Sequence, residues 1–203
     1  MLVVLISGRG SNMQALVEAG LPVAAVISNR ADAAGLEFAR ARNIPTAVVD
    51  HAGFASRDAF DDALAREIER HRPRLVALAG FMRVLTPAFV ESYRHRLLNI
   101  HPSLLPAFPG LHTHERALAA GVKLHGCTVH FVTPELDSGP IVIQAVVRVR
   151  PGEESGELAA RVLRQEHVIY PRAAGWFLDD RLVIRDGVVR VKGDDAQLVL
   201  AAD

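Results

Sequence analysis

The chain has 203 residues, half of them hydrophobic, which is enough to bury a sizeable core, and we expect one domain over residues 1–203. Lys plus Arg and Asp plus Glu number 23 each, without long runs of like charge, so neither nucleic acid nor a membrane surface is expected as a partner. No stretch approaches the roughly 20 apolar residues of a membrane span. The single cysteine, Cys127, excludes an intramolecular disulfide and favours a reducing, cytoplasmic location.

The first half of the chain alternates short aliphatic runs with longer segments of helical periodicity. We predict strands near residues 2–7, 23–28, 46–49, 74–79 and 97–101, and helices over 12–20, 32–42, 58–71 and 86–95. This alternation is typical of right-handed βαβ units, in which helices cover both faces of a parallel sheet.

The second half of the chain has a different pattern. Apolar runs at 123–132 and 141–149 are joined by a short segment with Pro and Gly, which predicts an antiparallel pair. A long helix follows over 155–178, and Pro171 should interrupt or kink it. Asp186-Gly187 then stands between two alternating runs and predicts a two-residue hairpin. The expected fold is α/β and Rossmann-like, with a mostly parallel central sheet flanked by helices and an antiparallel C-terminal portion.

The loop after the first strand, Ser7-Gly8-Arg9-Gly10-Ser11-Asn12, has the composition of an anion site. Its glycines allow close backbone approach, and Ser11 and Asn12 are placed to cap a helix whose N-terminal N–H groups suit a phosphate. A dinucleotide site would need a third glycine where Met13 stands, and a P-loop would need a following Gly-Lys-Ser or Gly-Lys-Thr. A single phosphate, as in a ribonucleotide, is the remaining ligand, and a plain βα turn is the alternative.

Asn99 and His101 share one face at the end of a predicted strand, because side chains two residues apart point the same way. An amide beside an imidazolium suits oxyanion stabilisation and proton transfer during acyl transfer. The alternative is that both side chains satisfy backbone groups at a strand end. Asp137 is a candidate partner that would orient His101, although such an Asp, judged alone, more often bonds its own turn.

Several segments together resemble the phosphoribosylglycinamide formyltransferase family of folate-dependent formyltransferases: the loop 7–12, the segments 79–85, 99–106 and 125–132, and Gln165-Glu166-His167. They follow the family's order and cover nearly the whole chain. The resemblance implies the transfer of the formyl group of 10-formyltetrahydrofolate, a cosubstrate, to the amine of glycinamide ribonucleotide. The products are formylglycinamide ribonucleotide and tetrahydrofolate, in de novo purine biosynthesis.

The resemblance also implies roles for individual residues. It assigns catalysis to Asn99, His101 and Asp137, ribonucleotide binding to Gly10, Ser11, Asn12 and Glu166, and folate binding to Arg57, Met82, Arg83, Val84, Leu85 and Asn99. It further implies a cis bond between Leu105 and Pro106. No metal is expected, because His112 and His114 lack a completing Cys, Asp or Glu set. Cys127 is expected to be a packed side chain, while the roles of Arg9 and His130 stay open.

Two other functions remain open. A formyltetrahydrofolate hydrolase would deliver the formyl group to water, but it has no use for a phosphate loop and usually carries an additional N-terminal domain. A non-catalytic nucleotide-binding module would keep the fold, since fold alone does not fix function. The presence of Asn99, His101 and Asp137 argues against such a module. The sequence does not determine the oligomeric state, and a homodimer is one option.

Overall fold

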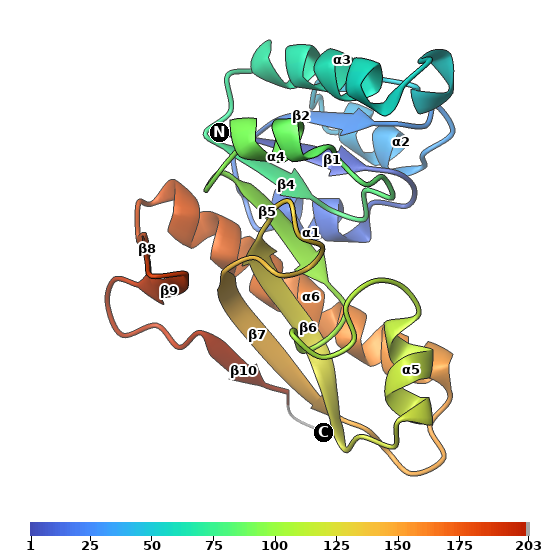
Figure 1. Ribbon diagram of the computed structural model, residues 1–203, viewed down its shortest axis with the longest axis vertical. Helices are drawn as coiled ribbons and strands as arrows, with labels where there is room; N and C mark the ends of the chain where they lie inside the picture. The colour runs from blue at the N-terminus through green and yellow to red at the C-terminus, as the bar shows by residue number, and fades with distance from the viewer. Residues whose placement is uncertain (202–203) are drawn as a thin grey trace. The chain divides into compact units, whose positions relative to one another are not determined.

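A computed structural model describes residues 1–201 of the chain (Figure 1). The chain forms two compact units, one from Met1 to Asn99 and the other beginning at Ile100. Residues 202 and 203, which the single-domain prediction includes, lie outside the described residues. The prediction of one domain over the full chain stays a prediction.

The first unit contains a parallel sheet with the strand order β5-β4-β1-β2-β3. These strands are β1 (Leu2–Ile6), β2 (Val23–Ser28), β3 (Thr46–Val48), β4 (Leu75–Leu78) and β5 (Leu97–His101), and they confirm the five predicted strands. All five residues of β1 are buried, as expected for the centre of a sheet that is covered on both faces.

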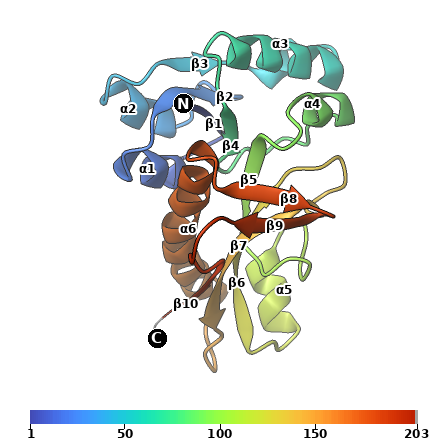
Figure 2. The same ribbon diagram turned by 90° about the vertical axis from the view of Figure 1, so that its left-hand side faces the viewer.

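Four α-helices cover this sheet, two on each face. They are α1 (Ser11–Glu18), α2 (Gly35–Arg40), α3 (Arg57–Glu69) and α4 (Pro87–Ser92), with a short 3₁₀ turn, η1, at His51–Gly53. Figure 2 shows α1 and α2 on one side of the strands and α3 and α4 on the other, the arrangement that right-handed crossovers produce. α2 and α4 are shorter than predicted.

The start of α1 differs from the prediction. Gly10 is the N-cap, in the left-handed conformation with φ of 68°, and no side chain caps the helix. Ser11 and Asn12 are instead the first two helical residues, so their predicted capping role is wrong. The first hydrogen bond of the helix runs from the Gln14 N–H to the Gly10 carbonyl at 2.9 Å. The glycine, which tolerates this φ, thus sets the direction of the helix start.

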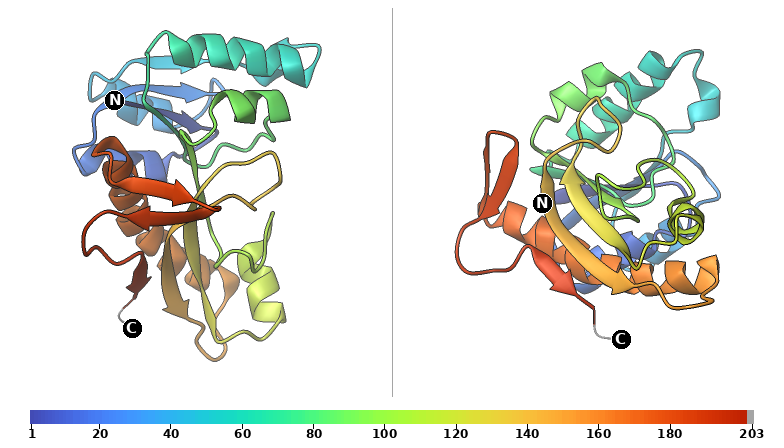
Figure 3. Two further views of the ribbon diagram at one scale, coloured as in Figure 1. Left: turned by 60° about the vertical axis from the view of Figure 1, so that its left-hand side comes forward. Right: turned by 60° about the horizontal axis from the view of Figure 1, so that its bottom comes forward.

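The second unit is built on an antiparallel pair, β6 (Leu124–Phe131) and β7 (Ile141–Arg148), which confirms the predicted change of pattern. The long helix α6 (Ser155–Leu178) packs along both strands, and α5 (Thr113–Ala119) contacts α6. The hairpin β8 (Leu182–Arg185) and β9 (Val188–Val191) follows α6, and β10 (Leu198–Leu200) lies beside β7 (Figure 3). Neither α5 nor β10 was expected.

Two backbone features of this unit had been predicted from single residues. Asp186 and Gly187 both have positive φ, 50° and 75°, as a two-residue type I′ turn requires. The Leu105–Pro106 bond is cis, as the family resemblance implied.

The predicted interruption at Pro171 is wrong, because α6 continues through it. A proline removes one backbone donor, but buried residues on both sides of it, among them Ile169, Tyr170, Ala173 and Ala174, anchor the helix in the core.

Candidate active site

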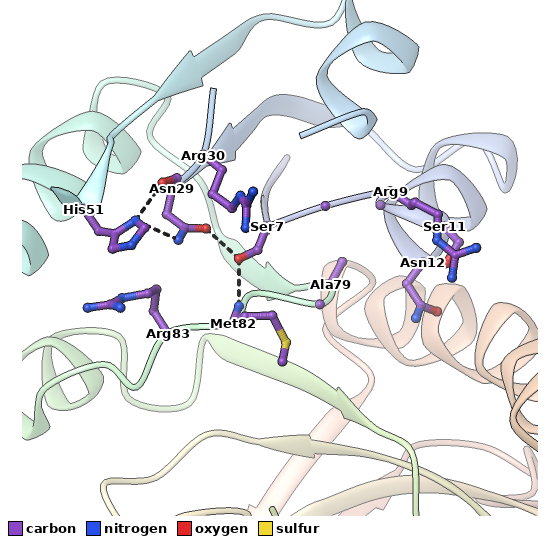
Figure 4. Close-up of a pocket in the computed structure, with 13 residues that line it drawn as sticks. Ser7, Arg9, Ser11, Asn12, Asn29, Arg30, His51, Ala79, Met82 and Arg83 are labelled. Atoms are coloured by element: carbon purple, nitrogen blue, oxygen red, sulfur yellow. Dashed lines mark hydrogen bonds between the residues drawn. The ribbon is translucent and has the colours of Figure 1, made fainter. Parts of the chain in front are cut away.

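A cavity of about 370 Å³ lies in the first unit, beyond the carboxyl ends of β1, β2 and β4 (Figure 4). It brings together the predicted phosphate residues Gly10, Ser11 and Asn12 with two predicted folate residues, Met82 and Arg83. This edge of an open α/β sheet is where ligands bind, and the volume is in the range of small-molecule pockets.

Arginine side chains give this cavity a positive character. Arg9, Arg30 and Arg83 all line it. The Arg30 guanidinium pairs with the Asp32 carboxylate at 2.8 Å, whereas Arg9 and Arg83 have no carboxylate partner among residues 1–201. Arg9 lies beside the start of α1 and Arg83 lies nearer His51 (Figure 4), and two guanidinium groups without a carboxylate partner in one cavity favour an anionic ligand.

The segment 82–85, which the family resemblance predicts to bind folate and which is called the folate loop hereafter, exposes apolar side chains. Met82 is 66% exposed and Val84 is 63% exposed. Val84 and Leu85 do not line the cavity, and neither does Arg57, which is the exposed first residue of α3. The structure therefore brings two of the predicted folate residues to this cavity.

A buried hydrogen-bond chain forms one wall of the cavity, and sequence reasoning missed it. The Met82 N–H donates to Ser7 Oγ at 2.8 Å, and the Ser7 hydroxyl donates to Asn29 Oδ1 at 2.5 Å. Asn29 Nδ2 lies 3.2 Å from His51 Nδ1 (Figure 4). Asn29 directly follows β2, at the carboxyl edge of the parallel sheet where ligands bind, and this position is the signal that could have found it.

In the second unit, His101 at the end of β5 lies beside Asp137. The distance from His101 Nδ1 to Asp137 Oδ2 is 3.5 Å, and the two side chains are 7% and 9% exposed. His101 Nε2 lies 3.0 Å from the Phe108 carbonyl. Both ring nitrogens thus face an oxygen atom, the Asp137 carboxylate on one side and the Phe108 carbonyl on the other.

Asp137 lies in a turn, but its carboxylate bonds the backbone of another loop and not that of its own, so the alternative of a turn Asp that bonds its own backbone is wrong. Its Oδ2 accepts from the Gly110 N–H at 2.8 Å, which links two loops that are far apart in the sequence. Its φ is 50°, a left-handed conformation that Asp tolerates better than most residues. The carboxylate is therefore held in place from outside its own loop.

Three further histidines surround this pair in the second unit. His130 Nε2 lies 3.8 Å from Asp137 Oδ1, and its Nδ1 lies 2.9 Å from the Phe131 carbonyl. His125 Nε2 lies 3.2 Å from His114 Nδ1. Burial, followed by the neighbouring His114, lowers the pKa of His125 to about 4, and burial also lowers the pKa of His114 and His130. These three rings favour the neutral form at neutral pH.

The remaining predicted residues lie on strands and helices of the two units. Asn99 is half-buried on β5, two residues before His101, so the two side chains leave the strand on the same face. Glu166 lies on the buried face of α6. Cys127 is fully buried, and burial raises the pKa of its thiol, with a further contribution from Glu166. A thiol in this environment is a packed side chain.

Within residues 1–201, no cluster of three or more His, Cys, Asp and Glu side chains is arranged to bind a metal ion. Over the same residues, none of the helices has the length and apolar character needed to span a bilayer.

Residues 1–174 match the formyl transferase family, and the chain belongs to that family. The chain is 51% identical to phosphoribosylglycinamide formyltransferase of Escherichia coli over 198 residues, which cover 95% of this chain and 93% of that protein. The crystal structure of phosphoribosylglycinamide formyltransferase from Anaplasma phagocytophilum has a TM-score of 0.93 and 41% identity, covering 99% of this chain and 98% of that one. A formyltetrahydrofolate deformylase structure from Pseudomonas syringae pv. tomato has a TM-score of 0.86 and 29% identity, covering 94% of this chain and 65% of that one.

Proposed function

We propose that this chain is an enzyme that transfers the formyl group of 10-formyltetrahydrofolate to the amine of glycinamide ribonucleotide. The products are formylglycinamide ribonucleotide and tetrahydrofolate. The observation that carries the proposal is the buried His101–Asp137 pair, in a chain that is 51% identical to a phosphoribosylglycinamide formyltransferase along almost its whole length. Purine biosynthesis is the pathway to which this reaction belongs.

In the proposed reaction, the neutral amine of the ribonucleotide attacks the formyl carbon on N10 of the folate. The carbonyl oxygen of the tetrahedral intermediate becomes negative, and the Asn99 amide and the His101 imidazolium stabilise it. The His101 Nε2–H, which donates to the Phe108 carbonyl at 3.0 Å, is the group that the oxyanion would take over. Collapse of the intermediate breaks the bond from the formyl carbon to N10.

Asp137 would have two tasks in this reaction. From the Nδ1 side, at a distance of 3.5 Å, its carboxylate orients the His101 ring and offsets the positive charge that the ring carries while it stabilises the oxyanion. With a water molecule it carries the proton that the attacking amine loses to the departing N10, so that the overall reaction conserves charge. No covalent acyl-enzyme is needed, because both substrates are bound together.

The proposed binding roles follow the two predicted sets. The ribonucleotide phosphate would lie against the backbone of Gly10, Ser11 and Asn12, where the first turn of α1 and the nearby Arg9 favour an anion. Glu166 would accept hydrogen bonds from the ribose hydroxyls. The folate would lie against the folate loop, residues 82–85, which offers backbone groups and exposed apolar side chains, together with Arg57 and Asn99.

A steady-state assay with both substrates tests the proposal against its alternatives. Formyl transfer to the ribonucleotide supports the enzyme as proposed, whereas formate release without transfer would support a hydrolase. Binding of either substrate without turnover would support a non-catalytic module. The positively charged cavity beside the Gly10 helix start favours the transferase, because a hydrolase has no phosphate to bind there.

We further propose a cytoplasmic location and one domain over the whole chain. The single, buried Cys127 forms no disulfide, which suits a reducing compartment. A homodimer is the assembly that sedimentation experiments should test.

A further inference from the structure

Buried side chains from other elements hold both ends of the folate loop by its main chain. At the start of the loop, Ser7 Oγ accepts from the Met82 N–H at 2.8 Å. Just beyond its end, Asp61 Oδ2 accepts from the Thr86 N–H at 2.6 Å. Ser7 is 8% exposed and Asp61 is 3% exposed, so both anchors lie inside the unit. Of the loop's own side chains, by contrast, Met82 and Val84 are exposed and the other two are half-buried.

The chemistry of the groups fixes which atom donates and which accepts in the series of hydrogen bonds that includes Ser7. A backbone N–H only donates, so Ser7 Oγ is the acceptor for Met82, and its single hydrogen is available for Asn29 Oδ1 at 2.5 Å. With Oδ1 committed to Ser7, the amide nitrogen of Asn29 points to His51 Nδ1 at 3.2 Å. Asn29 is 2% exposed, and a buried amide that lost either partner would carry a desolvation penalty.

Residues 8–12 of the predicted phosphate-binding loop, hereafter the phosphate loop, are held by different hydrogen bonds, none of which uses the Ser7 side chain. The Gly35 N–H donates to the Gly8 carbonyl at 3.1 Å, and the Gln14 N–H donates to the Gly10 carbonyl at 2.9 Å. The Gln14 side chain donates to the Arg9 carbonyl at 3.3 Å. Removing the Ser7 hydroxyl therefore releases the start of the folate loop and leaves the phosphate loop in place.

We propose that Ser7 and Asn29 are positioning residues for the folate cosubstrate. Asn29 orients the Ser7 hydroxyl, and Ser7 fixes the Met82 amide, so that the main chain of the folate loop is pre-organised before the cosubstrate binds. This inference rests on the proposed function, which places the folate against residues 82–85. Neither side chain needs to contact the folate.

Ser7→Ala and Asn29→Leu test this role in the full-length chain. We expect the KM for 10-formyltetrahydrofolate to rise about 5- to 30-fold, the factor that corresponds to the loss of one ordering hydrogen bond. The KM for the ribonucleotide, and kcat at saturating folate, should stay within about twofold, because the lost interaction serves only folate binding. Asn29→Asp retains an oxygen acceptor for Ser7 and should restore most of the folate affinity.

Ser92→Ala is the matched control, because it removes a hydroxyl of the same unit that donates to the Phe89 carbonyl of α4 at 2.7 Å. Its folate KM should match that of the unchanged chain. Thermal unfolding of each variant separates a loss of fold from a loss of positioning.

Amide hydrogen exchange at Met82, measured by NMR without substrates, reads the anchor directly. Faster exchange at Met82 in Ser7→Ala, together with the raised folate KM, supports the inference. Unchanged exchange overturns it, and so does faster exchange with an unaltered folate KM. If the unchanged chain transfers no formyl group, the proposed function fails, while the exchange measurement still decides whether Ser7 holds the loop.

Discussion

Asp137→Asn removes the negative charge beside His101 while it preserves the shape of the side chain. The amide oxygen can still accept from the Gly110 N–H, as Oδ2 does at 2.8 Å. The loop should therefore keep its position, and both substrates should still bind. The change falls on the interaction between the carboxylate and the His101 ring, 3.5 Å away.

The size of the effect follows from that distance. Two unit charges 3.5 Å apart interact by roughly 4 to 5 kcal/mol at an effective dielectric constant of about 20. At about 1.4 kcal/mol per factor of ten, the interaction with the ring alone accounts for a loss of up to roughly 3,000-fold. The amide dipole of Asn retains part of the attraction, so we expect kcat to fall on the order of 1,000-fold, within the range typical of a positioned acid or base. The two KM values should change little.

The assay is steady-state formyl transfer with each substrate varied in turn, and NMR of the His101 ring reports its protonation at neutral pH. The NMR signals of the ring should change in Asp137→Asn, because a carboxylate no longer faces Nδ1. Glu135→Gln, which removes a charge from an exposed position of the same loop, is the control and should behave like the unchanged chain. A near-normal kcat in Asp137→Asn, with an unaltered His101 ring, would refute the role of the carboxylate.

The structure also sets the expected result of four further experiments. Gly10→Val should raise the ribonucleotide KM strongly and the folate KM much less, because φ at Gly10 is 68° and a Cβ there would lie 3.1 Å from the Met13 side chain and 3.4 Å from the Gly35 backbone, which strains the start of α1 where the phosphate is proposed to bind. One residue inserted into the folate loop should abolish folate binding measured by fluorescence titration; undiminished affinity would contradict the placement. Gly126→Ala should lower the Tm and reduce the free energy of unfolding by about 1–3 kcal/mol or more, since its Cβ would lie 1.9 Å from a β7 carbonyl oxygen. As a control, the Cβ of Gly156→Ala meets nothing within 4 Å, so this change should be neutral or stabilising. The pKa of His125 is lowered to about 4 in the folded chain, so as the pH falls the unfolded chain binds the proton first. The free energy of unfolding should therefore keep its full value above about pH 6.5 and decline by up to roughly 3 kcal/mol as the pH falls towards 4. Urea unfolding should show a smaller decline in His125→Gln.

The sequence specified those parts of the fold that depend on local pattern. Aliphatic runs defined the five parallel strands, and Asp186-Gly187 defined the hairpin, because Asp-Gly favours the type I′ turn that joins two strands through two residues. The short helix α5 and the three-residue strand β10 were not predicted. β10 exists through its pairing with β7, more than 50 residues earlier, and α5 begins after His112 in a left-handed conformation. Neither feature has a periodic signal.

The candidate site, too, combines features that a local sequence pattern predicts with contacts between distant residues that it does not. The two-residue spacing of Asn99 and His101 is visible in the sequence, but the bond from the Gly110 N–H to Asp137 is a long-range contact. Alone, Asp137 looked like a turn residue. Ser7 was recognised only as part of a glycine-rich loop, because its partners Asn29 and Met82 lie 22 and 75 residues further along the chain.

In both units, buried polar side chains hold the main chain of a loop. In the first unit, buried Ser7 and Asp61 hold the main chain of the folate loop, and in the second, buried His101 and Asp137 hold the carbonyl of Phe108 and the N–H of Gly110. A buried polar side chain is costly unless it is bonded, and here its partner is in each case the backbone of an exposed loop. The position of these loops thus depends on buried polar residues more than on the loops' own side chains. Exposed positions such as Val84 should therefore tolerate substitution, whereas conservative changes at the buried anchors should alter substrate affinity or turnover without unfolding the chain.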